Sequence, residues 1–179
     1  MKRSSRLGVV PGFAAAAVCL GASLAAAQEG EAASAFSSLG AEGAIYETGP
    51  DEAIFVGVLS GVLYVEDATG AVEAGLIVCP GRIRVNTADS SQSAQADCAI
   101  VTAEGDRIYA DFSCEGAYRE GCYGELALVG GLGGREGVTG GGPAEFLTAA
   151  PDWAATPGNA VSTEAAGLLR IPELTFRLP

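Results

Sequence analysis

The residues of this chain that can do chemistry are carboxylates, tyrosines and arginines, because it contains no histidine and its lysine, Lys2, stands next to the first residue. Three pairs of such residues are spaced two apart: Tyr109 and Asp111, Tyr123 and Glu125, and Arg82 and Arg84. Residues two apart in a β-strand lie on one face. A tyrosine beside a carboxylate can supply acid–base chemistry, and paired arginines can hold a polar ligand group.

The role of these pairs depends on which face of each strand points inward. If the polar faces line an interior, the candidate catalytic residues are Tyr109, Asp111 and Glu125. If they point outward, the pairs are exposed contacts that contribute little to stability. The opposite faces favour the outward orientation, because they carry side chains typical of a core: Ile108, Phe112, Leu126 and Leu128.

Several mechanisms are excluded by what the sequence lacks. Without histidine there is no Ser-His-Asp triad and no histidine-ligated metal. Lys2 lies in the first 27 residues, which we expect to be removed, so no lysine remains to form a Schiff base. The cysteines show no C-x-x-C spacing, which argues against zinc. We therefore expect no metal and no cofactor.

The first 27 residues have the layout of a secretory signal peptide. A basic start is followed by an apolar stretch over 7–24 and by three alanines, Ala25 to Ala27. A retained membrane helix is the less favoured alternative, since Pro11 and Gly12 interrupt the stretch. We expect cleavage after Ala27 and export to the periplasm or the extracellular space.

The charge of the mature chain excludes two classes of partner. The chain has 10 basic and 22 acidic residues, and three of the basic ones precede residue 28, which leaves 7 − 22 = −15. Nucleic acids and anionic membrane surfaces both require clustered positive charge. We therefore expect no nucleic-acid partner and no membrane insertion after cleavage.

Four of the five cysteines follow the signal segment, and an even number in an exported chain favours two disulfides. Cys114 and Cys122 are placed as two strand ends across a hairpin loop, close enough for a bridge. The remaining pair is then Cys79 with Cys98.

The pattern after the leader is that of an all-β domain. Apolar and β-branched runs, six to nine in number, are separated by glycine, proline or acidic turn residues such as Glu104 to Asp106. A polar loop is expected over 87–95, and a long connection over 149–167. We expect a flexible N-terminal arm over 28–44 and one barrel or sandwich domain over 45–179.

Residues 130–142 read GGLGGREGVTGGG and admit three interpretations. A phosphate loop would require a lysine and a following helix, and neither is present. A linker would separate two domains, but the 179 − 27 = 152 mature residues suit only one. The favoured interpretation is a pair of strongly bent strands, with glycine at bulges and corners.

The segment 121–140, GCYGELALVGGLGGREGVTG, resembles the glycine-rich pattern of allene oxide cyclase-like and dirigent-like barrels, including exported bacterial members of unassigned function. The resemblance extends over about 50–148. It departs from the pattern at Leu132, where threonine is usual, and at Gly134 to Glu136, where an aromatic residue is usual. It implies an eight-stranded antiparallel barrel with a central cavity. In plants this scaffold guides the cyclisation or coupling of reactive apolar intermediates.

The function we expect is binding of a small apolar or amphipathic ligand in the barrel lumen, by a monomer or a small homo-oligomer. The expected lining residues are Ile108, Phe112, Leu126, Leu128, Leu174 and Phe176. Two alternatives stay open: a cofactor-free isomerase or cyclase, and a ligand-free structural or interaction protein of the envelope. A lumen of several hundred Å³ would argue against the last. Trp153 either plugs one end of the barrel or stacks on a ligand.

Overall fold

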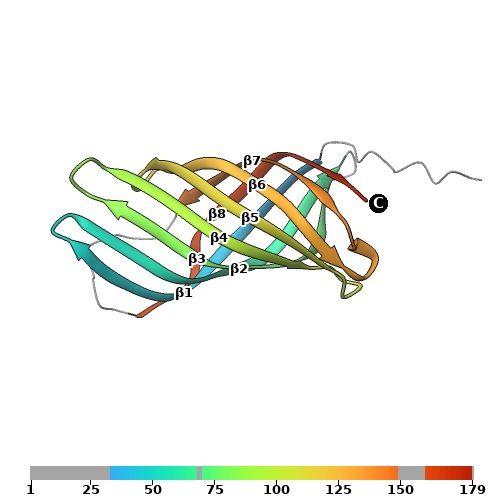
Figure 1. Ribbon diagram of the computed structural model, residues 1–179, viewed down its shortest axis with the longest axis horizontal. Coiled ribbons are helices and arrows are strands. Elements are labelled where there is room, and N and C mark those ends of the chain that lie inside the picture. The colour runs from blue at the N-terminus through green and yellow to red at the C-terminus, as the bar shows by residue number, and fades with distance from the viewer. Residues whose placement is uncertain (1–32, 68–69, 149–159, 179) are drawn as a thin grey trace, which may run out of the picture.

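The computed structural model describes residues 33–67, 70–148 and 160–178. Its strands are β1 (Ala33–Gly49), β2 (Glu52–Asp67), β3 (Gly70–Asn86), β4 (Ser91–Val101), β5 (Arg107–Ala117), β6 (Gly121–Leu132), β7 (Thr139–Thr148) and β8 (Ala160–Arg177). Each strand pairs antiparallel with the next, and β8 pairs with β1, so the sheet closes into a barrel (Figure 1). The predicted all-β barrel of eight antiparallel strands is confirmed. In these ranges there is no α-helix, and thus none that could span a membrane.

Three strands begin earlier than the sequence indicated. β1 starts at Ala33, which corrects the expectation of a flexible arm for residues 33–44. The inward side chains of this part are small or aliphatic, as at Ser37 and Leu39, so its apolar signal is weak; β2 and β8 pair with it on either side. β4 likewise includes residues 91–95 of the expected loop, and β8 begins at Ala160. The signal segment and residues 28–32 lie outside the described residues.

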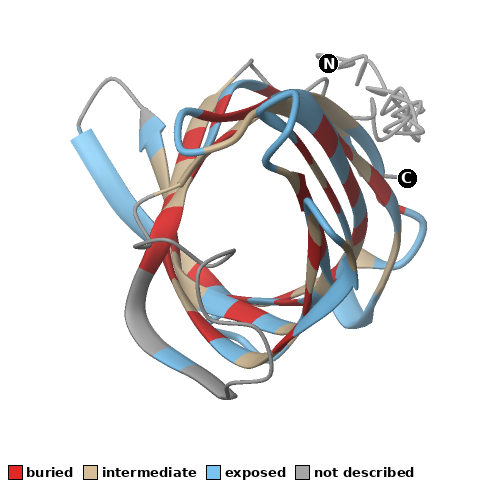
Figure 2. Cartoon of the chain, turned by 90° about the vertical axis from the view of Figure 1, so that its left-hand side faces the viewer, coloured by how far each residue is buried: buried red, intermediate tan, exposed pale blue. Residues whose placement is uncertain are grey.

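The core lies inside the barrel, because buried and exposed residues alternate along the strands (Figure 2). Large and small residues also alternate around the interior, as is common in small barrels. Gly43, Gly57 and Gly81 face one another on β1, β2 and β3, and the ring of Phe55 lies against the first two. Phe112 of β5 and Phe146 of β7 are also buried in the interior. These aromatic side chains therefore fill the parts of the interior in which they lie.

Both predicted disulfides are present and buried inside the barrel. Cys79 of β3 and Cys98 of β4 have their Cα atoms 4.1 Å apart. Cys114 of β5 and Cys122 of β6 bridge diagonally, with Cα atoms 5.3 Å apart. Each of these last two cysteines is paired across the ladder with a glycine, Gly124 and Gly116 respectively. The disulfides therefore link β3 to β4 and β5 to β6.

The glycine-rich segment 130–142 forms two bent strand ends, as predicted, but its middle is a 3₁₀ turn, η1 (Gly133–Arg135). Register shifts occur in the β5–β6 pairing between Tyr109 and Ala110, and in the β7–β8 pairing between Gly141 and Glu145. Gly141 has φ +142°, and a Cβ there would lie 3.0 Å from Cα of Ala127. The turn interrupts the strands because the chain must reverse from β6 into β7.

Candidate functional site

The polar pairs found in the sequence lie on the outer face of the barrel. Asp111, Tyr123 and Glu125 are exposed, and Tyr109 is half-buried on the same face. Arg82 donates a hydrogen bond to Oε1 of Gln95 at 2.6 Å. Arg84 is likewise exposed and forms an ion pair of 3.7 Å with Glu52. The structure thus places these six side chains on the outer surface, although on more than one part of it.

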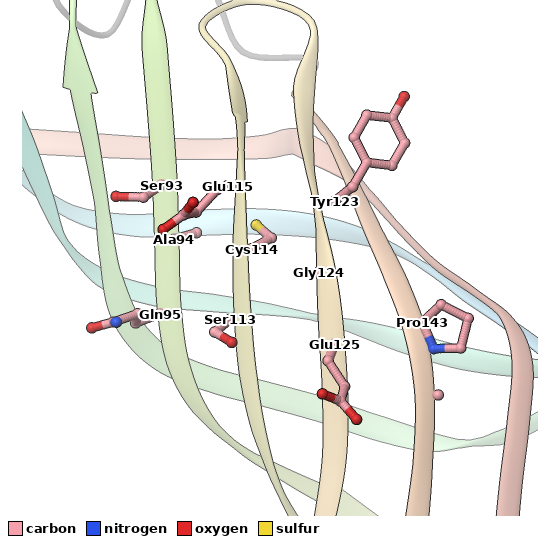
Figure 3. Close-up of a pocket in the computed structure, with 11 residues that line it drawn as sticks. Ser93, Ala94, Gln95, Ser113, Cys114, Glu115, Tyr123, Gly124, Glu125 and Pro143 are labelled. Atoms are coloured by element: carbon pink, nitrogen blue, oxygen red, sulfur yellow. The ribbon is translucent and has the colours of Figure 1, made fainter.

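Part of this outer face forms a wide trough of about 750 Å³ across β4, β5, β6 and β7 (Figure 3). Two cross-strand rows build it, one through Ser93, Glu115 and Tyr123 and the other through Gln95, Ser113, Glu125 and Pro143. The side chains that line it include two carboxylates and no basic group. A second outer hollow of about 570 Å³ shares Ser93 and Glu115 with it. Both hollows are polar and open to solvent, so they exclude water poorly.

A smaller cavity of about 150 Å³ lies inside the barrel, near the end formed by the β2–β3, β4–β5 and β6–β7 connections. Its lining is apolar except for Thr102 and Arg135. Among the apolar residues are Leu63 and Val138, together with four of the six predicted from the sequence: Ile108, Leu128, Leu174 and Phe176. A concave, largely apolar space with few polar groups is the usual form of a small-molecule site. This inner cavity is the candidate site.

The other two predicted lining residues, Phe112 and Leu126, are buried deeper in the barrel and do not line the inner cavity. They face each other across β5 and β6 and belong to the packed part of the interior. At about 150 Å³, the cavity is smaller than the lumen of several hundred Å³ that would have argued against a structural protein. The inner cavity lies near one end of the barrel, and the aromatic side chains of Phe55 and Phe146 are buried elsewhere in the interior, against glycines.

Two polar atoms at the inner cavity are buried without a hydrogen-bond partner among the described residues: Oγ1 of Thr102 and Nε of Arg135. Thr102 directly follows β4, and its backbone N–H donates to the carbonyl oxygen of Asp106 at 3.0 Å. Arg135 is the last residue of η1. Its Nε lies 4.0 Å from Oδ2 of Asp106, which is an ion pair too long for a hydrogen bond.

Asp106 connects the two turns that carry these atoms. Its Oδ1 accepts a hydrogen bond of 3.0 Å from the backbone N–H of Gly134 in η1, while its backbone carbonyl binds Thr102. Gly133, with φ +71°, brings the η1 backbone so close that a side chain there would collide with Asp106. The glycine-rich segment thus serves to place Arg135 at the cavity.

Sequence reasoning missed Thr102 and Arg135 as site residues. Two signals were present: Glu104 to Asp106 marks the hairpin turn beside Thr102, and Arg135 is the basic residue of the glycine-rich segment. Neither signal indicates that the two turns meet, because 28 residues separate Asp106 from Gly134. Trp153, which the sequence suggested as a plug or stacking residue, lies outside the described residues.

Comparison with known proteins identifies a similar solved structure but no family. No protein-family profile matches the sequence, and no curated protein matches it. Among solved structures, this chain is similar to a pterocarpan synthase dirigent protein, with 12% sequence identity and a TM-score of 0.37. The alignment covers 93% of this chain and 100% of that chain. At this identity and TM-score, the similarity carries no argument about this chain.

Proposed function

We propose that this protein is an exported β-barrel that binds a small apolar or amphipathic molecule in the inner cavity. The observation that carries the proposal is the largely apolar space of about 150 Å³ inside the barrel, with Leu63, Leu128 and Phe176 in its lining. Apolar cavities of about this size stay dry and bind single-ring molecules such as benzene. Burial of apolar area, worth roughly 25 cal/mol per Å², is the driving force for such binding.

Export is part of the same proposal. The signal-like start of the chain and the two buried disulfides support it, since disulfides persist in oxidising compartments. The destination is then the periplasm or the extracellular space. The negative net charge of −12 for the whole chain agrees with a protein that avoids nucleic acids and anionic surfaces.

The two alternative functions predict different roles for the inner cavity. An isomerase or cyclase that used Tyr109, Asp111 or Glu125 would hold its substrate on the outer face, because these residues lie there. Its activity would depend on Glu125 and not on the inner cavity. A structural protein of the envelope would bind nothing in the cavity, which would then be a simple packing gap.

The test uses two neighbouring residues of β6 that face opposite ways. Leu128 lines the inner cavity and is 8% exposed, whereas Val129 points outward and is 56% exposed. In wild-type protein, ethylbenzene should raise the thermal midpoint in a concentration-dependent way, because a ligand at 100 times its Kd stabilises by about 2.7 kcal/mol. Leu128→Phe should abolish the rise by filling the cavity, and Val129→Phe should retain it.

Each result decides between the functions. A rise that persists in Leu128→Phe would place binding elsewhere and overturn the proposal. The absence of any rise in wild-type protein, at concentrations near the solubility limit of ethylbenzene, would favour the structural alternative.

A further inference from the structure

The outer surface of the barrel is apolar over most of β2 and the middle of β3. The outward residues of β2 alternate with buried ones and are Ile54, Val56, Val58, Ser60, Val62 and Tyr64. β3 pairs with β2 (Figure 1) and adds Leu76, Val78 and Pro80. Together these residues are called the apolar face. Val56 is 47% exposed and Leu76 is 53% exposed. A continuous exposed apolar surface of this kind is typical of an interaction site.

The two ends of the apolar face carry opposite charges. On β3, Arg82 is paired with Val56 at one end, and Glu73 is paired with Tyr64 at the other. Both charged side chains are exposed. The guanidinium of Arg82 donates a hydrogen bond of 2.6 Å to the neutral amide of Gln95, so it retains its positive charge. The apolar face therefore has a positive end, an uncharged middle and a negative end.

A second copy of this chain is complementary to such a face in one orientation. Two sheets pack face to face with their strands nearly aligned, and in a symmetric dimer the two-fold axis lies in the plane between them. If the axis crosses the strands, their direction reverses, and Arg82 of one copy lies opposite Glu73 of the other. If the axis runs along the strands, Arg82 lies opposite Arg82 and the like charges repel.

The register of β2 and β3 supports the reversed orientation. Ser60 and Val78 are paired with each other, and Ser60 is four residues from both Val56 and Tyr64. The positive and negative ends are thus equally far along β2 from this central row. An axis across the row brings each Val78 opposite its own counterpart and makes both charged contacts at once.

The apolar face is large enough for a stable contact. The strands β1 and β4 widen it with the outer residues Phe36, Ala44, Ala99 and Val101. From Ile54 to Tyr64 a strand advances about 34 Å, and four strands are about 19 Å wide, which gives about 650 Å² per copy. Stable interfaces bury about 600–1,000 Å² per partner.

We propose that two copies of this chain associate through the apolar face as a two-fold dimer with reversed strand direction. Burial of the apolar face drives the association, and the contacts between Arg82 and Glu73 set the orientation. A membrane surface fits the face less well, because the net charge of −12 opposes approach to anionic headgroups. The inner cavity lies inside the barrel and takes no part in the dimer, so the dimer and the proposed function can fail independently.

The first test is sedimentation velocity over a series of chain concentrations, with two matched variants. Val78→Lys brings two lysines together near the axis and should weaken dimerisation at least about tenfold. Val129→Lys makes the same change on β6, three strands from β3, and should dimerise like wild-type protein. Both valines are exposed, at 38% and 56%, so both variants should keep the wild-type thermal midpoint within a few degrees.

The second test exchanges the charges at the two ends. Arg82→Glu and Glu73→Arg should each weaken dimerisation about tenfold at low salt. Glu73→Arg is the sharper of the two, because it lowers the net negative charge and would strengthen an association limited by general repulsion. The double variant restores opposite charges at both contacts and should dimerise like wild-type protein. An equal mixture of the two single variants should form the mixed dimer.

The contrary outcomes are distinct. Wild-type protein that stays monomeric up to about 100 µM, well above the micromolar Kd of weak interfaces, would overturn the dimer. A dimer that persists in Val78→Lys would overturn the apolar face as its interface. Failure of the double variant and of the mixture to associate would overturn the reversed orientation. Monomeric wild-type protein that co-sediments with phosphatidylcholine vesicles, when Val78→Lys does not, would assign the apolar face to a membrane surface instead.

Discussion

The ring of Phe55 occupies the space that a side chain at Gly57 would need: a Cβ on Gly57 would lie 2.6 Å from Cζ of Phe55. Gly43 is paired with Gly57 across β1 and β2, and a Cβ on Gly43 would lie 2.8 Å from Cε2 of the same Phe55 ring. These glycines are therefore packing partners of an aromatic ring. They explain why the barrel is filled at this level.

Replacement of Gly57 should be destabilising for this reason. We expect Gly57→Ala to lower the free energy of unfolding by about 1–3 kcal/mol, the usual cost of overpacking a core. Gly49→Ala is the matched control, because its Cβ would meet nothing closer than 3.6 Å; it should change stability by less than about 0.5 kcal/mol. Urea unfolding measures both, and equal stabilities would show that Phe55 does not pack against Gly57.

The disulfides should stabilise the barrel unequally. The loops they close span sequence separations of 19 and 8 residues. By chain entropy, the Cys79–Cys98 bridge contributes about 3.3 kcal/mol and the Cys114–Cys122 bridge about 2.6 kcal/mol. Alanine replacement of each pair, followed by denaturant unfolding, should therefore cost more for the first pair. Peptide mapping without reduction should recover these two links, and crossed links would contradict the strand pairing.

Asp97 and Asp111 face each other on the outer surface of β4 and β5. Like charges directly opposite are destabilising, so Asp97→Asn and Asp111→Asn should each raise the free energy of unfolding by about 0.2–1 kcal/mol at low salt. Since either change relieves the same repulsion, the double variant should gain less than the sum. Strict additivity in this double-mutant cycle would show that the two carboxylates do not interact.

The outer candidates Tyr109 and Glu125 should be irrelevant to binding in the inner cavity. We expect Glu125→Gln and Tyr109→Phe to bind ethylbenzene with wild-type affinity, because both residues lie on the opposite side of the sheet from the cavity. Calorimetry tests this directly. A loss of affinity in either variant, with stability unchanged, would place the binding site on the outer trough.

Asp89 gives the stability a small dependence on pH. Hydrogen bonds from the side chain and the backbone N–H of Ser91, the latter 2.9 Å long, lower the pKa of the Asp89 carboxyl. The stabilisation is thus present above the unfolded pKa of about 3.9 and is lost as the pH falls through the lower folded value. Carboxyl-carbon NMR titration should find this pKa below that of an aspartate in an unfolded peptide. Asp89→Asn should remove the dependence.

The strands could be predicted wherever polar and apolar residues alternate clearly. The alternation of polar and apolar residues over 107–114 predicted both faces of β5 correctly, because every second side chain of a strand points to the same face. The same reasoning failed for residues 33–44, where alanine, serine and glycine give little apolar signal. That part of β1 is held by its pairing with β2, the next strand, and with β8, which lies far along the chain.

The candidate site was less accessible to sequence reasoning. The alternation of polar and apolar residues predicted that Ile108 and Leu128 point into the barrel. It could not predict that the inner cavity lies near one end of the barrel, because the position of the cavity depends on where the aromatic rings pack against glycine. Thr102 and Arg135 meet only because Asp106 links two turns of the closed barrel. Such contacts follow from register and closure rather than from local pattern.

The most direct test of the central claim is a crystal structure of the protein under xenon pressure. Dry apolar cavities of about this volume bind xenon, so we expect one xenon atom in the inner cavity, against Leu63, Leu128 and Phe176. The same experiment on Leu128→Phe should show none there. A wild-type cavity that contains ordered water instead of xenon, or that is closed by side chains, would contradict an apolar binding site in this barrel.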